Sequence, residues 1–432
     1  MKYVSTRSPS ISSSLSLAIE RGLAEDGGLY VPESLPKVFL EDVRDADSLP
    51  RMAVKLLARF FEGDMLAPAL ATISAEALNF PTPLEPINEN TAVLELFHGP
   101  TAAFKDVGAR FLAGCFDVLP TDSPRTILVA TSGDTGGAVA SAFHGRPGVD
   151  VAILFPSGGV SPLQEKQLTC WEGNVRSFKV RGTFDDCQRL VKTAFAARGT
   201  ADEIPNRHLT SANSINIGRL LPQMVYYAWS SVQYLSRTGQ APGFVIPTGN
   251  VGNAMAAIWV MAMGLPIREI VLATNANRVV PDYLDQGIFK PQPSIKTLAN
   301  AMDVGNPSNL ERFMTLTARD GSLRDRIRAV SIDDATIREA ILAGPSRYGR
   351  IWCPHTAVAV HARELQSSPH WIVVSTAHPA KFSEIVEPLL GQTVDMPPQL
   401  QALLDKPSRC VEIGAEYGEL RGALQFGGGI AT

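Results

Sequence analysis

From Thr126 onward the sequence alternates between short apolar runs and longer stretches that have the apolar spacing of helices. The first two apolar runs are Ile127 to Ala130 and Val151 to Phe155, and a helical stretch separates them. This order of strand, helix and strand is typical of a largely parallel sheet covered by helices. The pattern therefore predicts an α/β fold, in which ligands bind beyond the carboxyl ends of the strands.

The first part of the chain has a different pattern. A chain of 432 residues is too long for one ordinary hydrophobic core, so two or three domains are expected. Before residue 90 the apolar spacing is mainly helical, and prolines at positions 81, 83 and 86 then interrupt it. We therefore interpret residues 1–90 as a mainly helical N-terminal domain that precedes the α/β body.

The charge of the chain favours a small-molecule ligand, and its cysteine content indicates the compartment. The formal net charge is −4 and no block of like charges occurs, so nothing indicates a nucleic-acid or anionic-membrane partner. The longest apolar candidate, residues 254–267, is too short to span a membrane, and the serine-rich N-terminus lacks the apolar region of a signal peptide. The five scattered cysteines form no C-x-x-C pair, which predicts a reducing, cytoplasmic location.

Lys105 stands at the junction between an expected strand and an expected helix. Residues 92–94 are apolar enough for a buried strand, and residues 109–118 have helical spacing. The apolar residues 102–104 beside the lysine would lower the pKa of its ammonium group by desolvation. A neutral lysine amine can form a Schiff base. On this stretch alone, an ordinary surface lysine at a helix start remains the alternative, because lysine is seldom buried.

Two loops that contain glycine follow expected strands and precede expected helices. One is residues 131–137, and the other is residues 249–253, which lead into a long apolar helix. Consecutive backbone N–H groups followed by a helix N-terminus can bind a phosphate group. The first loop taken alone fits an ordinary strand-to-helix turn better than a phosphate site, because a glycine-rich loop is a weak motif. Neither loop has the G-x-G-x-x-G pattern or a P-loop lysine, so no nucleotide site of those kinds is indicated.

A third junction of this kind ends the apolar run at residues 371–374, where the hydroxyl residues Ser375 and Thr376 follow. All three loops would meet at the carboxyl ends of the strands. A lysine in an apolar environment beside a phosphate site without nucleotide motifs suggests pyridoxal 5′-phosphate. No metal is expected, because the histidines at 98, 144, 355 and 378 do not have metal-ligand spacing.

Taken together, these motifs give the chain a specific family resemblance. Over residues 1–387 it resembles the bacterial and fungal branch of the threonine synthases through the segments MKYVSTR, GLAEDGGLYVPE, LELFHGPTAAFKD, ATSGDTGG, SPLQEKQ, LTSANSINIGRLLPQ, PTGNVGN, ATNAN, NAMDVGNPSN and STAHPAKF. The resemblance implies the tryptophan-synthase β-like fold, in which two three-layer α/β domains hold the cofactor in the cleft between them. We expect these domains at residues 91–235 and 236–392, after the N-terminal domain at residues 1–90. The tail, residues 393–432, resembles no family element and receives no role.

The resemblance also implies roles for particular residues. Lys105 matches the Schiff-base lysine, Thr376 matches the hydroxyl at the pyridine nitrogen, and the cofactor-phosphate loop corresponds to Gly249, Asn250, Val251, Gly252 and Asn253. The family usually has phenylalanine at the position of Val251. Since the loop acts through backbone N–H groups, we expect the phosphate site to survive with looser packing.

A substrate with a carboxylate and a dianionic phosphate needs further donors. The candidate substrate-binding residues are Ser132, Asp134, Thr135, Ser161, Lys166, Ser211, Asn213, Asn216 and Arg219. Asp134 would repel an anion, so we expect it to cap the following helix or to orient Thr135. Arginine suits bidentate phosphate recognition, although a surface ion pair remains the alternative for Arg219 and Lys166.

The family reaction converts O-phosphohomoserine and water to threonine and phosphate by pyridoxal-phosphate-dependent γ-elimination and β-hydration. We expect this lyase activity, with Lys105 as the mobile base, in a monomer or homodimer. Two alternatives remain. The first is a relative of the family that acts on another phosphorylated or halogenated amino acid. The second is a non-catalytic relative that binds phosphoesters. Loss of the lysine would be the simplest sign of the latter, and Lys105 is present.

Overall fold

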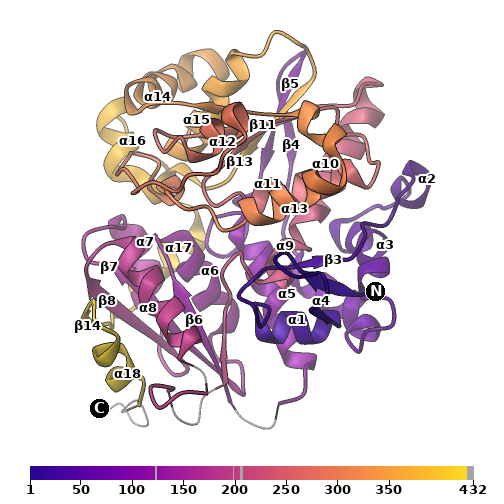
Figure 1. Cartoon of the computed structure of the whole chain (residues 1–432). Coiled ribbons are helices and arrows are strands. Elements are labelled where there is room, and N and C mark those ends of the chain that lie inside the picture. Colours follow the sequence, from indigo (N-terminus) through magenta and orange to yellow (C-terminus); the bar gives the residue numbers. More distant parts are fainter. Residues whose placement is uncertain (122–123, 198, 205–207, 426–432) are drawn as a thin grey trace.

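The computed structural model describes residues 1–121, 124–197, 199–204 and 208–425. Two units that each contain a sheet lie one above the other in Figure 1, and the N-terminal segment packs beside the lower one. The lower sheet has the strand order β14-β8-β7-β6-β9, and the upper sheet has the order β12-β11-β10-β13-β5-β4. The expected α/β class with a separate N-terminal region is confirmed.

The N-terminal region joins a small antiparallel sheet to several helices. In α3 the buried residues Met52, Leu56 and Phe60 recur every four positions and form its apolar face. Ser14 caps α1, because its side chain accepts a hydrogen bond from the backbone N–H of Leu17. The elements are β1 (Tyr3–Ser5), β2 (Ser12–Ser13), α1 (Leu15–Arg21), β3 (Tyr30–Pro32), α2 (Leu40–Val43), α3 (Leu49–Phe61), η1 (Ala67–Ala69) and α4 (Leu70–Ala77).

The lower unit contains a parallel sheet. Strand β6 is buried at every position, as expected for a strand that helices cover on both faces. The strands are β6 (Arg125–Ala130), β7 (Val149–Pro156), β8 (Val175–Arg181), β9 (His208–Thr210) and β14 (Val411–Gly414). The helices are α5 (Lys105–Val118), α6 (Asp134–Phe143), α7 (Pro162–Thr169), α8 (Phe184–Ala196), α9 (Ile217–Leu220) and α18 (Tyr417–Gln425).

The upper unit has a mainly parallel sheet with one antiparallel edge strand, β4. Its strands are β4 (Leu84–Asn88), β5 (Thr91–Glu95), β10 (Gly243–Pro247), β11 (Ile270–Thr274), β12 (Ile327–Ser331) and β13 (Trp371–Ser375). Its helical elements are α10 (Gln223–Thr238), α11 (Gly252–Ala262), α12 (Val279–Gln286), η2 (Asn300–Met302), α13 (Leu310–Arg319), η3 (Gly321–Arg326), α14 (Asp334–Tyr348), α15 (Pro354–Glu364), η4 (Pro379–Phe382) and α16 (Ser383–Leu390).

The two sheets do not divide the chain at residue 90, where a domain boundary was expected. Strand β5, which was expected in the same domain as Lys105, pairs in parallel with β13 of the upper sheet from Thr91 to Glu95. The chain then passes to the lower unit through residues 96–104 and begins α5 at Lys105. Lys105 therefore lies where the two units meet, directly after a segment that is anchored in the upper sheet.

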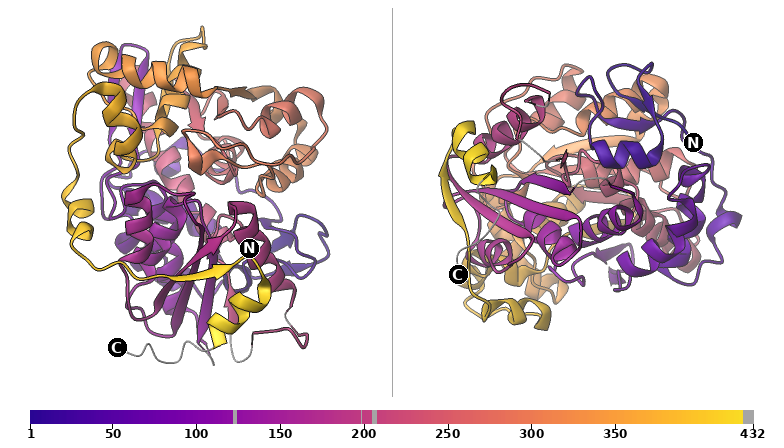
Figure 2. Two further views of the ribbon diagram at one scale, coloured as in Figure 1. Left: turned by 90° about the vertical axis from the view of Figure 1, so that its left-hand side faces the viewer. Right: turned by 90° about the horizontal axis from the view of Figure 1, so that it is seen from below.

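The expected tail beyond residue 392 is a structural part of the lower unit. Figure 2 shows it running from the upper unit down one side of the molecule, past α17 (Pro398–Leu404), to β14 and α18. Strand β14 pairs in parallel with β8, and the buried residues Leu420 and Leu424 pack in the same core as Leu190. The glycine-rich ending from residue 426 lies outside the described residues.

No helix in the described part of the chain combines the length and the apolar character needed to cross a membrane.

The buried tail residues predict a stability effect. Leu420→Ala should lower the free energy of unfolding by about 2–5 kcal/mol, because the substitution leaves a cavity in the core. Val411→Ala on the same tail is the matched control, since Val411 is 51% exposed and should change stability by less than about 0.5 kcal/mol. Urea unfolding of both full-length variants measures the difference. Equal stabilities would show that the tail does not contribute to the core.

Candidate active site

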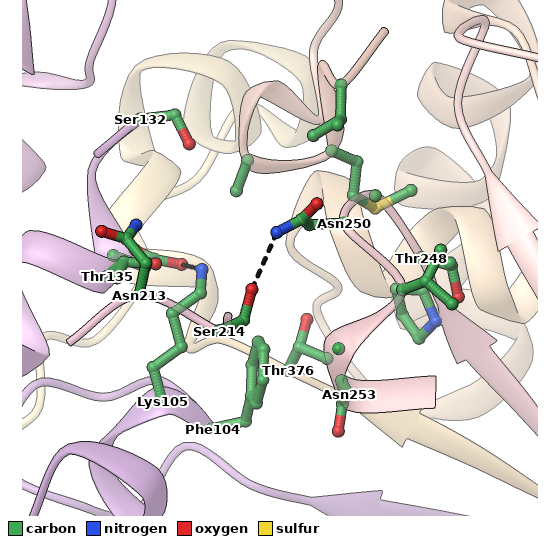
Figure 3. Close-up of a pocket in the computed structure, with 18 of the residues that line it drawn as sticks. Phe104, Lys105, Ser132, Thr135, Asn213, Ser214, Thr248, Asn250, Asn253 and Thr376 are labelled. Atoms are coloured by element: carbon green, nitrogen blue, oxygen red, sulfur yellow. Dashed lines mark hydrogen bonds and ion pairs between the residues drawn. The ribbon is translucent and has the colours of Figure 1, made fainter. Parts of the chain in front are cut away.

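A cavity between the two units contains most of the residues that the sequence singled out. Figure 3 shows Lys105, Asn213 and Ser214 facing Asn250 and Thr376 across this space. The predicted site residues that line it are Lys105, Ser132, Asp134, Thr135, Asn213, Arg219, Gly249, Asn250, Val251, Gly252, Asn253 and Thr376. They come from both units and from loops at the carboxyl ends of strands.

Lys105 is the first residue of α5, and its side chain is only 15% exposed. Its Nζ lies 5.1 Å from the centre of the Phe104 ring, so the expected apolar contact is present. Burial lowers the pKa of the Lys105 ammonium, and the nearby cation of Lys381 lowers it further, while Asp134 acts in the opposite direction. Lys105 is therefore held in an environment that favours the neutral amine.

The segment before Lys105 is fixed by backbone hydrogen bonds to the residues around Thr376. The Phe104 N–H donates to the Thr376 carbonyl at 2.9 Å, and the His378 N–H donates to the Ala102 carbonyl at 3.1 Å. Ala102 has a φ of 53°, a left-handed conformation that alanine rarely adopts. These bonds set the distance between the lysine and the end of β13.

Asp134 does not cap the following helix, so the first of the two roles expected for it is wrong. Gly133 occupies the cap position and makes no side-chain capping bond, while Asp134 is the first helical residue. Its carboxylate is buried between two lysines, with Lys381 Nζ at 2.9 Å and Lys105 Nζ at 3.7 Å. Although burial opposes ionisation, the two cations hold the pKa of Asp134 well below its usual range.

The loop formed by residues 249–253 leads into the N-terminus of α11. Val251 is the helix cap residue and has a φ of 62°, unusual for a β-branched residue. A Cβ added to Gly249 would lie 2.7 Å from the Met302 Cα, so only glycine fits there. The Asn250 Nδ2 donates to Ser214 Oγ at 2.7 Å, a bond drawn in Figure 3 that joins this loop to the lower unit. The loop is thus closely packed against backbone on one side and faces the cavity on the other.

Several buried nitrogen atoms of the cavity wall have no hydrogen-bond partner among the described residues. They are Arg219 Nε, Asn253 Nδ2 and His355 Nδ1. The Asn253 Oδ1 accepts from Tyr226 and Tyr227, so its Nδ2 is the free donor. His355 Nε2 accepts from the Ala301 N–H, so the neutral ring carries its proton on Nδ1. Unpaired donors of this kind fit a ligand that is rich in acceptors, such as a phosphate ester.

Burial lowers the pKa of both Arg219 and His355, but only His355 becomes neutral at neutral pH. Arg219 is 3% exposed, and burial lowers its pKa to about 10, so it remains a cation at neutral pH. It is not the surface ion pair considered as an alternative. Burial lowers the pKa of His355 to about 4, and its ring is neutral.

The remaining predicted substrate residues do not line the cavity. Ser161 caps α7, Asn216 caps α9, and the Ser211 Oγ accepts from the Asn213 N–H. Lys166 donates to the Lys406 carbonyl, and its neighbour Glu165 pairs with Lys179 instead. Their side chains support loops and helix ends around the site.

Sequence reasoning missed Lys381, Ser214 and the role of His355. Lys381 is completely buried, but a lysine in the sequence gives no sign of burial, and its partner Asp134 lies in the other unit. His355 was considered only as a metal ligand. Within the described residues, no group of three histidine, cysteine or acidic side chains is placed to hold a metal ion.

Comparison with protein families covers nearly the whole chain. The family described as "Pyridoxal-phosphate dependent enzyme" matches residues 76–374. "Threonine synthase N terminus" matches residues 2–78, and "Threonine synthase, C-terminal" matches residues 356–423. The last match includes most of the tail, so the expectation that the tail resembles no family element is wrong.

Individual relatives agree with these matches. Threonine synthase from Haemophilus influenzae is 38% identical over 98% of this chain and 99% of its own length. The crystal structure of threonine synthase from Escherichia coli has a TM-score of 0.92 at 37% identity, and covers 98% of this chain and 99% of that one. PLP-bound threonine synthase from Brucella melitensis has a TM-score of 0.88 at 34% identity, with the same coverage. The chain therefore belongs to the threonine synthase family of pyridoxal-phosphate-dependent enzymes.

Proposed function

We propose that this cavity binds pyridoxal 5′-phosphate and O-phosphohomoserine, and that the chain converts the latter with water to threonine and phosphate. The observation that carries the proposal is the presence of Lys105, the 249–253 loop and Thr376 around one cavity whose wall contains unpaired buried donors. Bound pyridoxal phosphate supplies an electron sink, which makes protons next to the amino-acid nitrogen removable.

The cofactor would be held at both of its ends. The backbone N–H groups of residues 249–253 stand before the N-terminus of α11, whose dipole favours an anion. Thr376 follows β13 on the cavity wall and would place its hydroxyl at the ring nitrogen. A hydroxyl accepts or donates a hydrogen bond but, unlike a carboxylate, carries no charge that would keep a proton on that nitrogen. Lys105 would form the covalent link.

The substrate would be held mainly by groups of the lower unit. Arg219 is a buried cation that lines the cavity, which suits a phosphate or carboxylate oxygen. Ser132, Thr135 and Asn213 line the same side of the cavity and offer neutral donors. We assign supporting roles to Ser161, Lys166, Ser211 and Asn216, because their side chains are occupied within the protein.

Lys105 would act as the mobile base. When not bonded to the cofactor, its neutral amine would take a proton from the substrate Cα, give that proton back to the bound substrate and cofactor, and so be neutral again to take the Cβ proton. Burial favours the neutral form of this amine.

We also infer a cytoplasmic location, because the cysteines are free and mostly buried. The formal net charge of −4 supports our inference that the protein has no nucleic-acid partner, and we propose that it is a monomer or a homodimer.

The proposed activity predicts a balanced reaction. Full-length protein loaded with pyridoxal phosphate should release phosphate and threonine from O-phosphohomoserine in equal amounts, measured by phosphate assay and chromatography. Lys105→Ala should slow both by at least about 100-fold, as expected for loss of a general base. Lys179→Met, which removes a surface lysine paired with Glu165, is the control and should leave the rate unchanged. Faster turnover of another phosphorylated amino acid would contradict the assigned substrate.

The phosphate loop predicts an effect on cofactor affinity. Gly249→Ala places a methyl group 2.7 Å from the Met302 Cα, so the loop must shift and its N–H groups would leave the positions in which they are proposed to hold the phosphate. Cofactor affinity, measured by titration of the cofactor-free chain, should fall by at least about tenfold, or ~1.4 kcal/mol. Gly321→Ala is the control, because its added Cβ meets no neighbouring atom within 4 Å. Equal affinities in the two variants would place the phosphate elsewhere.

A further inference from the structure

A second lysine lies behind the reactive one and shares its carboxylate partner. Lys381, in η4, is completely buried, and its Nζ lies 2.9 Å from Asp134 Oδ1. The other carboxylate oxygen, Oδ2, faces Lys105 Nζ at the longer distance of 3.7 Å. Asp134 therefore makes its close ion pair with Lys381 and only a loose one with Lys105.

The Lys381–Asp134 pair is held in place from several directions. Lys381 Nζ also donates to the Thr101 carbonyl at 2.8 Å, and the Ser161 Oγ donates to the Lys381 carbonyl at 2.9 Å. Gln164 Nε2 donates to Asp134 Oδ1 at 3.0 Å. A Cβ on Gly133 would lie 2.4 Å from the Gln164 side chain, so the close approach of this amide requires glycine at position 133. Residues 161 and 164 belong to the SPLQEKQ segment, whose contacts support this pair.

We propose that Lys381 is a positioning residue that occupies Asp134 and so keeps Lys105 free to react as a neutral amine. This proposal rests on the function assigned to Lys105 above. Without Lys381, the buried carboxylate would have Lys105 as its remaining cation, and a close ion pair would hold that lysine as an ammonium. A protonated Lys105 can neither attack the cofactor aldehyde nor accept a substrate proton.

The other charged and titratable groups around Lys105 do not replace Lys381. Arg219 on α9 and His355 on α15 line the cavity, but the structure gives neither of them a bond to Asp134. Asp106, on the same helix as Lys105, accepts two hydrogen bonds from Thr101. Lys381 and Gln164 are the described side chains that donate to Asp134 Oδ1, and of these only Lys381 carries a charge.

The test is the pH dependence of covalent cofactor capture by the full-length chain. The chain is freed of cofactor, mixed with pyridoxal phosphate at a series of pH values, and quenched with borohydride at set times. Mass analysis then counts the cofactor fixed to Lys105. The capture rate should rise with pH as the amine loses its proton, so the midpoint of this profile reports the pKa of Lys105.

Removal of the Lys381 charge should raise that midpoint by about one pH unit or more, as expected for a carboxylate that gains a new cationic partner. Lys381→Met removes the charge together with the hydrogen bonds, and Lys381→Gln removes the charge while keeping an N–H donor. Asp134→Asn should move the midpoint in the opposite direction, because it removes the anion that favours the ammonium. Lys179→Met, the surface-lysine control, should leave it unchanged.

The outcomes separate this proposal from the assigned function. If Lys381→Gln or Lys381→Met lowers stability but keeps the wild-type midpoint, Lys381 is only structural and the proposal is wrong. If neither Lys381 variant folds, the Asp134→Asn arm decides, and an unchanged midpoint there overturns the proposal. If borohydride fixes no cofactor to Lys105 at any pH in the unmodified chain, the function assigned to Lys105 is wrong instead.

Discussion

The parallel pairing of β5 with β13 determines where the chemistry can take place. The two strands are distant in sequence, but their pairing brings their carboxyl ends to one edge of the upper sheet. The segment after β5 carries Lys105, and the segment after β13 carries Thr376 and Lys381. Backbone hydrogen bonds and the Ala103–Ala377 bridge then hold the two segments against each other. Lys105, Thr376 and Lys381 are thus positioned by main-chain geometry, which side-chain substitution alters little.

The sequence predicted well those structural features that depend on residues close together in the chain. The strand-to-helix junctions at Lys105 and at residues 249–253 were visible because apolar periodicity changes there, and the structure places both at the cavity. The sequence did not show to which of the two sheets a given strand belongs. A buried strand such as β5 has the same composition in either sheet, and its partner β13 lies far along the chain. The expected boundary at residue 90 was placed by the prolines that precede it. The strands on either side of that boundary, β4 and β5, pair with each other in the upper sheet, so the boundary does not separate two domains there.

The charge arrangement around Lys105 was also beyond local reasoning. Asp134 was recognised as an unusual member of an anion-binding site, but its compensation by Lys381 depends on burial and on contacts between the units. The tail was missed for another reason, since β14 has only four residues and the first two of them are exposed. A weakly apolar edge strand gives little periodic signal until its partner β8 is known.

Left-handed backbone at non-glycine residues occurs at two places in the site, Ala102 and Val251. Each conformation costs about 1–3 kcal/mol, which the surrounding structure must offset. At Ala102 the backbone bonds to Gly99 and His378 do so, and at Val251 the side chain is buried. Strain of this kind is tolerated where a backbone group must face a ligand, and both residues adjoin groups assigned to the cofactor.

The return of the chain to β8 has a consequence for biosynthesis. Strand β8 ends at Arg181, and the strand that covers its edge, β14, begins only at Val411. At about 5–20 residues per second, a ribosome needs more than ten seconds to make the chain between them. During that time the edge of β8 presents unpaired backbone N–H and C=O groups to other nascent chains. The sheet of the lower unit is therefore completed only after β14 has been made, and chains that terminate before Val411 retain an exposed strand edge.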